Sequence, residues 1–167
     1  MKFIFFYLFL TFLFLKPVFS KQILGFANVI DGDTIHINSY KIRLEGIDAP
    51  EMKQRCKNSF LKTSSIVSFD YQKDYLCGEK FKNKLELKIN KKKIRCVLAG
   101  KDRYNRYLGT CFKNKINLNK WMVKSGYAIA YRRYSKKYIL DEEFARKNKL
   151  GLWSGSFLNP EKWRKLN

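Results

Sequence analysis

The sequence of 167 residues lacks several features that define common protein classes. It contains one histidine and four cysteines with no Cys-x-x-C pair. A single histidine and these cysteine spacings supply no paired ligands, which argues against a zinc site. The missing Cys-x-x-C motif argues against thiol chemistry as the function. For an exported chain, two disulfide bonds are the better interpretation of the four cysteines.

Acidic residues are also scarce. Only 14 Asp and Glu accompany 35 Lys and Arg, which gives a formal net charge of +21 at pH 7. Such a charge favours a polyanionic partner, and nucleic acid is the first candidate. Most of the basic residues are lysines, so a general compositional bias is the alternative explanation. Charge alone therefore indicates a class of partner and no particular reaction.

No apolar run reaches the roughly 20 residues that a membrane-spanning helix requires. The run from Phe3 to Leu15 is almost unbroken but has only about 13 residues, and it ends before a Lys-Pro pair and Ser20. This pattern predicts a secretory signal peptide at residues 1–20, cleaved after Ser20. An uncleaved membrane tether is the alternative. Residues 21–167 are then expected to form a single domain, exported to the periplasm or secreted.

The most informative segment is residues 31–51, which reads DGDTIHINSYKIRLEGIDAPE. Its first letters predict a turn, and the alternating letters TIHI predict a strand. A second strand is expected from Lys41 to Ile47, broken by Gly46 and ending before a proline that lacks an amide hydrogen. If the two strands pair as a hairpin through Asn38-Ser39, Asp33 and Asp48 lie side by side. The sequence therefore predicts a carboxylate pocket suited to a hard cation.

Three motifs, DGDT, RLEGIDAPE and DRYNR, occur in an order that resembles the active-site signature of the staphylococcal nuclease (thermonuclease) family. The resemblance runs from about Val29 to the C-terminus, and the stretch between Glu51 and Cys77 fits least well. It implies an α+β fold, a five-stranded OB-fold barrel with about three helices. It also implies calcium-dependent hydrolysis of DNA and RNA, with 3′-phosphate products.

The resemblance further implies roles for individual residues. Glu51 would orient or deprotonate the attacking water, and Arg43 and Arg106 would donate to the phosphoryl oxygens. The expected calcium ligands are Asp33, Asp48 and a backbone carbonyl near Ala49.

Substrate contacts are predicted outside this catalytic set. Arg103, Tyr104 and Tyr131 are candidates for binding bases or phosphates, although ordinary packing also explains a tyrosine. His36 lies between two isoleucines and points to the opposite face of its strand, so solvent exposure is expected. The substrate would be single-stranded or frayed nucleic acid, and the enzyme is expected to be a monomer without a stable protein partner. A non-catalytic nucleic-acid-binding module and a cationic exported protein that binds anionic polymers are the alternatives.

Four cysteines allow three disulfide pairings. Cys96 and Cys111 lie equally far from the centre of a polar turn at residues 100–105, as the partners of a hairpin would. This register pairs them with each other and leaves Cys56 for Cys77.

Other elements are predicted less distinctly. Ser59 to Tyr75 shows no clear period and is expected to be a loop or a short frayed helix. Glu79 to Lys88 favours a helix, with a strand as the alternative, and Asn117 is a plausible N-cap for a further helix. A last helix is expected from Ser135 to Lys149 with an apolar stripe of Tyr138, Phe144 and Ala145. The aromatic C-terminal tail is expected to pack across the barrel.

Overall fold

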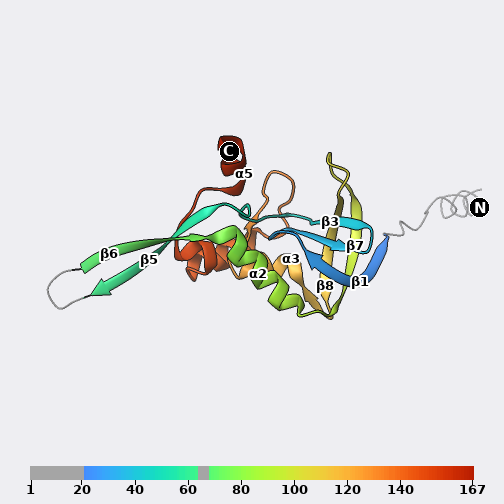
Figure 1. Ribbon diagram of the computed structural model, residues 1–167, viewed down its shortest axis with the longest axis horizontal. Helices are drawn as coiled ribbons and strands as arrows, with labels where there is room; N and C mark the ends of the chain where they lie inside the picture. The colour runs from blue at the N-terminus through green and yellow to red at the C-terminus, as the bar shows by residue number, and fades with distance from the viewer. Residues whose placement is uncertain (1–20, 64–67) are drawn as a thin grey trace, which may run out of the picture.

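The computed structural model describes residues 21–63 and 68–167. The predicted signal peptide at residues 1–20 lies outside the described residues. Within the described part, no helix is long and apolar enough to span a membrane. Figure 1 shows a small barrel at one end of the molecule and a long hairpin that projects from the other end.

The barrel is made of five strands that close on themselves. Their order is β3-β2-β1-β7-β8, and a parallel pairing between β3 and β8 completes the ring. The strands are β1 (Gln22–Val29), β2 (Thr34–Ile37), β3 (Tyr40–Leu44), β7 (Lys93–Lys101) and β8 (Tyr107–Lys113). The predicted α+β fold with a five-stranded barrel is therefore confirmed.

Alternating apolar residues fill the barrel because successive strand side chains point to opposite faces. Ile35, Ile37, Ile42, Leu44 and Ile94 are completely buried. β2 and β3 form the predicted hairpin, with Ile37 opposite Tyr40 and the turn at residues 38–39. The short strand β4 (Ile47–Asp48) follows β3 after a break at residues 45–46, as the sequence predicted.

Four α-helices occur in the described residues: α2 (Cys77–Ile89), α3 (Leu118–Lys124), α4 (Ile139–Lys147) and α5 (Pro160–Leu166). α2 confirms the helical interpretation of residues 79–88, and it buries Phe81, Leu85 and Ile89. Asn117 caps α3 as predicted, since its side chain accepts a hydrogen bond from the amide of Lys120.

The prediction for α4 was partly wrong. The helix begins at Ile139 rather than near Ser135, because a turn at residues 131–135 precedes it. Tyr138 and Ala145 are buried as expected, whereas Phe144 is 45% exposed. Glu142 is 3% exposed and takes the inward position instead, where it accepts a hydrogen bond from the amide of Ala130.

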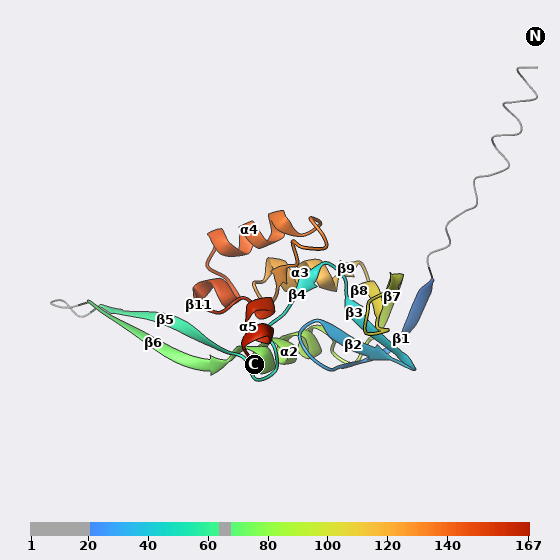
Figure 2. The ribbon, with the colours of Figure 1, turned by 90° about the horizontal axis from the view of Figure 1, so that it is seen from above.

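The prediction of a loop or frayed helix at residues 59–75 was wrong. This region belongs to an antiparallel hairpin of β5 (Arg55–Thr63) and β6 (Ser68–Leu76). The hairpin is the arm that projects from the molecule in Figures 1 and 2. A ladder of backbone pairs joins the two strands, and a third strand, β11 (Gly155–Ser156), pairs with Lys57 and Asn58 of β5.

Both predicted disulfides are present. Cys96 and Cys111 lie opposite each other on β7 and β8, with 4.1 Å between their Cα atoms. Cys56 and Cys77 join the base of the projecting hairpin to the first residue of α2. No free cysteine occurs in the described residues.

The C-terminal segment is ordered and folds back beside the barrel. A 3-10 helix, η1 (Gly151–Ser154), leads to β11, which pairs with β5 rather than with a barrel strand. α5 then follows an N-cap at Asn159 and a buried Pro160. In Figure 2, α5 lies between the base of the hairpin and the barrel. The tail therefore packs at the junction of these two parts instead of across the barrel.

Two connections fix the barrel edge that carries the candidate site. β4 pairs with β10 (Ile129–Ala130), which places Ile129 opposite Asp48. Asn119 is completely buried, and its side-chain amide donates to the backbone carbonyls of Glu45 and Gly109. The site is thus attached both to the barrel and to the helical half.

Candidate active site

Arg43 joins the two aspartates that the sequence predicted to lie side by side. Its Nη1 donates to Oδ1 of Asp33 at 2.8 Å, and its Nη2 donates to Oδ1 of Asp48 at 2.9 Å. Both ion pairs that Arg43 forms with the described residues are therefore with these aspartates. Arg43 of β3 lies opposite Thr34, the residue that follows Asp33, so the hairpin register brings Arg43 beside Asp33.

Burial is strongest at Asp48, whose side chain has no exposed surface. Burial raises the pKa of this carboxyl above its ordinary value, because an ionised carboxylate loses its hydration. The charge of Asp33 also raises this pKa, and the nearby arginines only partly oppose the shift. For Arg43, burial alone would lower the pKa, but the two aspartates outweigh it and raise the pKa. Two carboxylates and one guanidinium are thus held together in a largely buried environment.

Asp33 is oriented by the turn that precedes β2. Its Oδ2 accepts the amide of Ala49 at 3.2 Å, and its Oδ1 also accepts the hydroxyl of Thr34. A side chain at Gly32 would place a Cβ 2.6 Å from the Cβ of Ala49, so only glycine permits this approach. The structure thus brings Ala49 to Asp33 through its N–H group. The predicted role of an Ala49 carbonyl as a metal ligand stays a prediction.

Asp31 also belongs to this turn, although the sequence did not single it out as a ligand. Its Oδ1 accepts the amide of Asp33 at 2.9 Å. Burial, together with the charge of Asp33, raises the pKa of Asp31 to about 6. Negative charge is therefore crowded at this end of the barrel.

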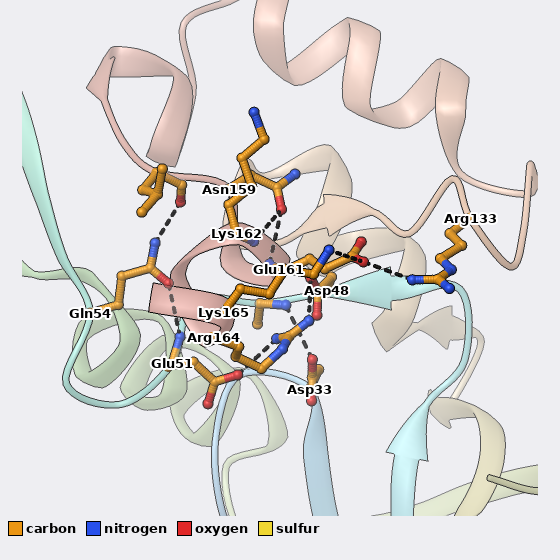
Figure 3. A network of polar contacts seen from close by, with 12 residues as sticks. Asp33, Asp48, Glu51, Gln54, Arg133, Asn159, Glu161, Lys162, Arg164 and Lys165 are labelled. Carbon is orange, nitrogen blue, oxygen red and sulfur yellow. Dashed lines mark hydrogen bonds and ion pairs between the residues drawn. The ribbon is translucent and has the colours of Figure 1, made fainter. Parts of the chain in front are cut away.

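Glu51 lies beyond β4, and its backbone is fixed by Gln54. Gln54 is completely buried. Its Oε1 accepts the amide of Glu51 at 3.2 Å, and its Nε2 donates to the carbonyl of Leu158 at 2.6 Å. A Cβ at position 78 would come within 1.9 Å of the Glu51 carbonyl oxygen, so Gly78 allows α2 to lie against this loop. The loop that carries Glu51 is therefore held between α2 and the C-terminal segment (Figure 3).

Arg164 is a charged group at the site that sequence reasoning missed. Its Nη1 donates to Oε1 of Glu51 at 2.8 Å, and its Nη2 donates to Oδ2 of Asp48 at 3.0 Å. Figure 3 shows its guanidinium pointing from α5 toward both carboxylates. The two contacts are 113 and 116 residues apart in sequence, so no local pattern could reveal them. The sequence predicted only that the aromatic C-terminal tail packs against the rest of the domain, and it assigned no role to Arg164.

Arg106 lies on the rim and does not contact the aspartates that Arg43 joins. Its Nε and Nη2 contact Oδ2 of Asp102, at 2.8 Å and 2.7 Å. Burial alone would raise the pKa of Asp102, but hydrogen bonds from Arg106 and from the amide of Tyr104 lower it. Arg103 and Arg106 both lie over the ring of Tyr104, at 4.8 Å and 5.4 Å from its centroid. The motif DRYNR thus forms a cationic loop around an exposed tyrosine.

Of the tyrosines in the segment 127–134, Tyr131 lies beside the site and Tyr127 does not. The guanidinium of Arg43 lies 5.8 Å from the centroid of the Tyr131 ring, and Tyr131 packs edge-on against Tyr134. Tyr127 is partly buried and instead stacks on Phe81 of the core.

A cavity of about 800 Å³ connects most of these groups. Its lining includes Asp33, Arg43, Ala49, Glu51, Tyr104, Arg106, Tyr131 and Arg164. Arg103, the other predicted substrate contact, also lines the cavity. The predicted site residues other than Asp48 therefore line one cavity. Asp48 lines a second cavity of about 560 Å³, which shares Tyr131 with the first.

The donor set fits a hard cation with few protein ligands. In the described part of the chain, no group of three or more His, Cys, Asp or Glu side chains is placed to hold a metal. Asp33 and Asp48 nonetheless supply carboxylate oxygens, and calcium also accepts backbone carbonyls and waters as ligands. A cation beside Asp48 would also stabilise a carboxylate whose ionisation burial disfavours. The two aspartates thus offer oxygen donors of the kind that calcium accepts, and in the structure all four of these oxygens accept hydrogen bonds from protein groups.

The prediction that His36 is exposed to solvent was wrong. The sequence predicted a solvent-exposed ring, but the residue is only partly exposed, and its Nε2 is covered without a hydrogen-bond partner in the structure. Its position between Asn28 of β1 and Lys41 of β3 accounts for the partial cover. It does not line the cavity that holds the carboxylates.

Comparison with known proteins supplies an independent result. The family described as "Staphylococcal nuclease homologue" matches residues 41–155. The chain is 30% identical over 160 residues to a micrococcal nuclease of Shigella flexneri, covering 84% of this chain and 79% of that protein. It is 32% identical over 154 residues to an uncharacterized endonuclease of Haemophilus influenzae, covering 87% of this chain and 75% of the relative.

A third relative has a different description. The succinoglycan biosynthesis protein ExoI of Rhizobium meliloti is 34% identical over 137 residues, which cover 80% of this chain and 66% of that protein. Relatives with nuclease names and one named for polysaccharide synthesis therefore share this sequence pattern.

Proposed function

Because the chain belongs to the family of staphylococcal nuclease homologues, we propose that it is a nuclease that uses calcium to hydrolyse phosphodiester bonds of DNA and RNA. The products would carry a 3′-phosphate, as the family resemblance implies. The observation that best supports the proposal is the bridge from Arg43 to Asp33 and Asp48, at 2.8 Å and 2.9 Å, beside Glu51. This arrangement combines anionic ligands, a candidate base and a phosphate-binding cation.

A phosphodiester repels nucleophiles because it is negatively charged, so a catalyst must neutralise this charge and place a water in line with the leaving oxygen. Asp33 and Asp48, with waters and the Ala49 carbonyl, are the proposed calcium ligands. When bound, calcium would supply positive charge to the phosphoryl oxygens.

Glu51 is the proposed general base. Its side chain is 34% exposed at the cavity, which lets water reach its carboxylate. It would accept a proton from water as the water attacks phosphorus, and such a base contributes about 100-fold or more to turnover. Of the three carboxylates that the family resemblance places in the catalytic set, Glu51 alone has no proposed ligand role, and it lines the cavity.

Arg43 and Arg106 are the proposed phosphate contacts. Guanidinium groups donate two parallel hydrogen bonds to phosphoryl oxygens, and these bonds strengthen as charge accumulates. Arg106 uses its Nε and Nη2 on Asp102. It would therefore contact the phosphate through Nη1, or exchange Asp102 for the phosphate.

The substrate is proposed to be a flexible strand. Arg103, Tyr104 and Tyr131 lie around the cavity and provide charge and ring faces for bases of any sequence. Single-stranded or frayed segments can bend toward the covered aspartates more easily than a stable duplex.

Export is proposed together with this activity. Two disulfides in the structure suit an oxidising compartment. Cleavage after Ser20 would leave residues 21–167 as a single domain that acts as a monomer.

The direct test is incubation of the purified chain with single-stranded DNA, duplex DNA and RNA, with calcium or with a chelator. We expect cleavage of all three substrates in calcium, fastest on the single strands, and its loss in chelator. Mass spectrometry of the products reports which side of the bond retains phosphate. Binding of nucleic acid without cleavage in any metal would reject the proposed reaction.

A further inference from the structure

We propose that Arg164 is a positioning residue for hydrolysis, supplied by helix α5, and that it acts by holding the carboxylate of Glu51 beside Asp48. This role rests on the proposed function, in which Glu51 is the general base. The residues matched to the family end at position 155, so α5 lies beyond the region that the family comparison covers.

The first support is the geometry of the contact. One planar guanidinium reaches Glu51 at 2.8 Å through Nη1 and Asp48 at 3.0 Å through Nη2. Because these two donors are fixed in a rigid fork, the contact sets both the distance and the relative orientation of the two carboxylates. Among the described residues, Arg164 is the hydrogen-bond partner recorded for the Glu51 carboxylate. Without this contact, the side chain of Glu51 would be free to turn into solvent.

The second support is the anchoring of α5. The side chain of Asn159 accepts the amides of Glu161 and Lys162, and Pro160 is buried at the first turn. Glu161 accepts Nη1 of Arg133 at 3.0 Å, which joins α5 to the turn after β10 (Figure 3). Arg164 is therefore presented by a capped and tethered helix.

The third support is that the same tail also fixes the backbone of Glu51. Gln54 accepts the amide of Glu51 and donates to the carbonyl of Leu158, directly before α5. Leu158 thus fixes the main chain of Glu51 through Gln54. Arg164 fixes the carboxylate of Glu51 by direct contact. Such double support of one side chain is what a precisely aimed base requires.

The effect of removing Arg164 on turnover distinguishes a positioning role from one in which Arg164 only shields the carboxylates. A cation that only masks the carboxylates would slow the enzyme, and its removal would raise turnover. A positioning cation lowers turnover when it is removed. Both roles predict tighter calcium binding after removal, because a positive charge 3.0 Å from Asp48 repels a second cation. A purely structural role predicts weaker calcium binding and weaker activity together.

The test compares Arg164→Gln, Arg164→Lys and the control Lys165→Gln, all in the full chain. Lys165 lies on the same helix, is 70% exposed and pairs only with Glu161 among the described residues, so its change removes the same charge. Calcium affinity is measured by isothermal titration calorimetry with calcium alone, and kcat and KM are measured on single-stranded DNA. Thermal melts check that each variant is folded.

We expect Arg164→Gln to lower kcat ~10-fold or more, to leave KM within ~3-fold, and to tighten calcium binding ~3-fold or more. Arg164→Lys keeps the charge but reaches one carboxylate, so its kcat should lie between those of Arg164→Gln and the wild type. Lys165→Gln should match the wild type. In a Glu51→Gln background, Arg164→Gln should cause little further loss, because the two changes affect one step.

Distinct results separate the failure of this role from the failure of the function. If the wild-type chain cleaves nucleic acid and Arg164→Gln has an unchanged or higher kcat, the positioning role is wrong and the proposed function stands. Additive losses in the double variant would show that Arg164 acts independently of Glu51. No cleavage by the wild-type chain would overturn the proposed function and this role with it.

Discussion

The candidate site has two halves that differ in how the fold builds them. The barrel half, Asp33, Arg43 and Asp48, comes from one short segment and is mostly buried. The outer half, Arg106, Tyr131 and Arg164, comes from three separate segments beyond β7. Side chains in the outer half are more exposed, as with Arg164 at 32% against 13% for Arg43.

The difference shows how each half obtains its precision. Strand register fixes the barrel half, because a shift of one residue would turn Asp33 or Arg43 to the opposite face. Individual hydrogen bonds fix the outer half, such as those from Arg106 to Asp102 and from Arg164 to Glu51. Substitutions in the barrel half should therefore affect folding and activity together. Substitutions in the outer half should affect activity with little loss of stability.

The largest expected effect is that of Arg43→Met in the barrel half. It leaves Asp33 and Asp48 buried without their shared cation, so the free energy of unfolding should fall by roughly 3–5 kcal/mol in chelator. Calcium should recover part of this loss, because it replaces the missing charge. Urea denaturation with and without calcium measures both effects.

The control for this change is Arg55→Met. Arg55 is 60% exposed and lies 3.7 Å from Asp74, so its loss should cost less than about 1 kcal/mol. Equal stability losses in the two variants would contradict the distinction between buried and exposed pairs.

The two disulfides extend the comparison. Replacing Cys96 and Cys111 by serine removes a link across 15 residues of the barrel and should cost about 3 kcal/mol in the chain-entropy model. Replacing Cys56 and Cys77 should have a similar effect on stability but should also lower kcat, because Cys77 adjoins the glycine that packs against Glu51. Urea melts and kcat values at 25 °C separate the two cases. Identical kcat values in both double variants would remove this distinction.

Arg106→Lys should have a moderate effect confined to activity. It keeps the charge but loses the two-pronged donor geometry, so kcat should fall by about 10-fold while the melting temperature stays nearly constant. Kinetics on single-stranded DNA together with a thermal melt are sufficient. A large drop in stability would place Arg106 in the same class as Arg43.

The smallest expected effect is that of His36→Ala. His36 is near the barrel half in sequence but does not line the cavity. Turnover should therefore remain within about twofold of the wild type, whereas loss of a general base costs about 100-fold or more. Loss of activity without loss of folding would mean that the imidazole takes part in the reaction.

Most of the barrel half could be predicted from the sequence, because its information is local. The turn letters, the alternating isoleucines and the two-residue loop at Asn38-Ser39 determine the hairpin, and the hairpin places Asp33 beside Asp48. The pairing of Cys96 with Cys111 followed from the same kind of register. These inferences needed only neighbouring residues and the period of a strand.

The outer half was less accessible for a physical reason. Arg164 meets Glu51 across 113 residues, and a single arginine in a basic tail carries no local signal for such a contact. The β5–β6 hairpin was missed because its visible support, the pairing with β11 and the Cys56–Cys77 disulfide, comes from residues that are distant in sequence. Burial of Glu142 in place of Phe144 likewise depends on the amide of Ala130, which the sequence of α4 does not reveal.

The central claim is that Glu51 performs proton transfer at a calcium site formed by Asp33 and Asp48. The most direct measurement is the kcat of Glu51→Gln on single-stranded DNA at saturating calcium, with calcium affinity determined separately by calorimetry. The account predicts a loss of about 100-fold or more in kcat while calcium still binds. Near-normal turnover of Glu51→Gln at saturating calcium would contradict it.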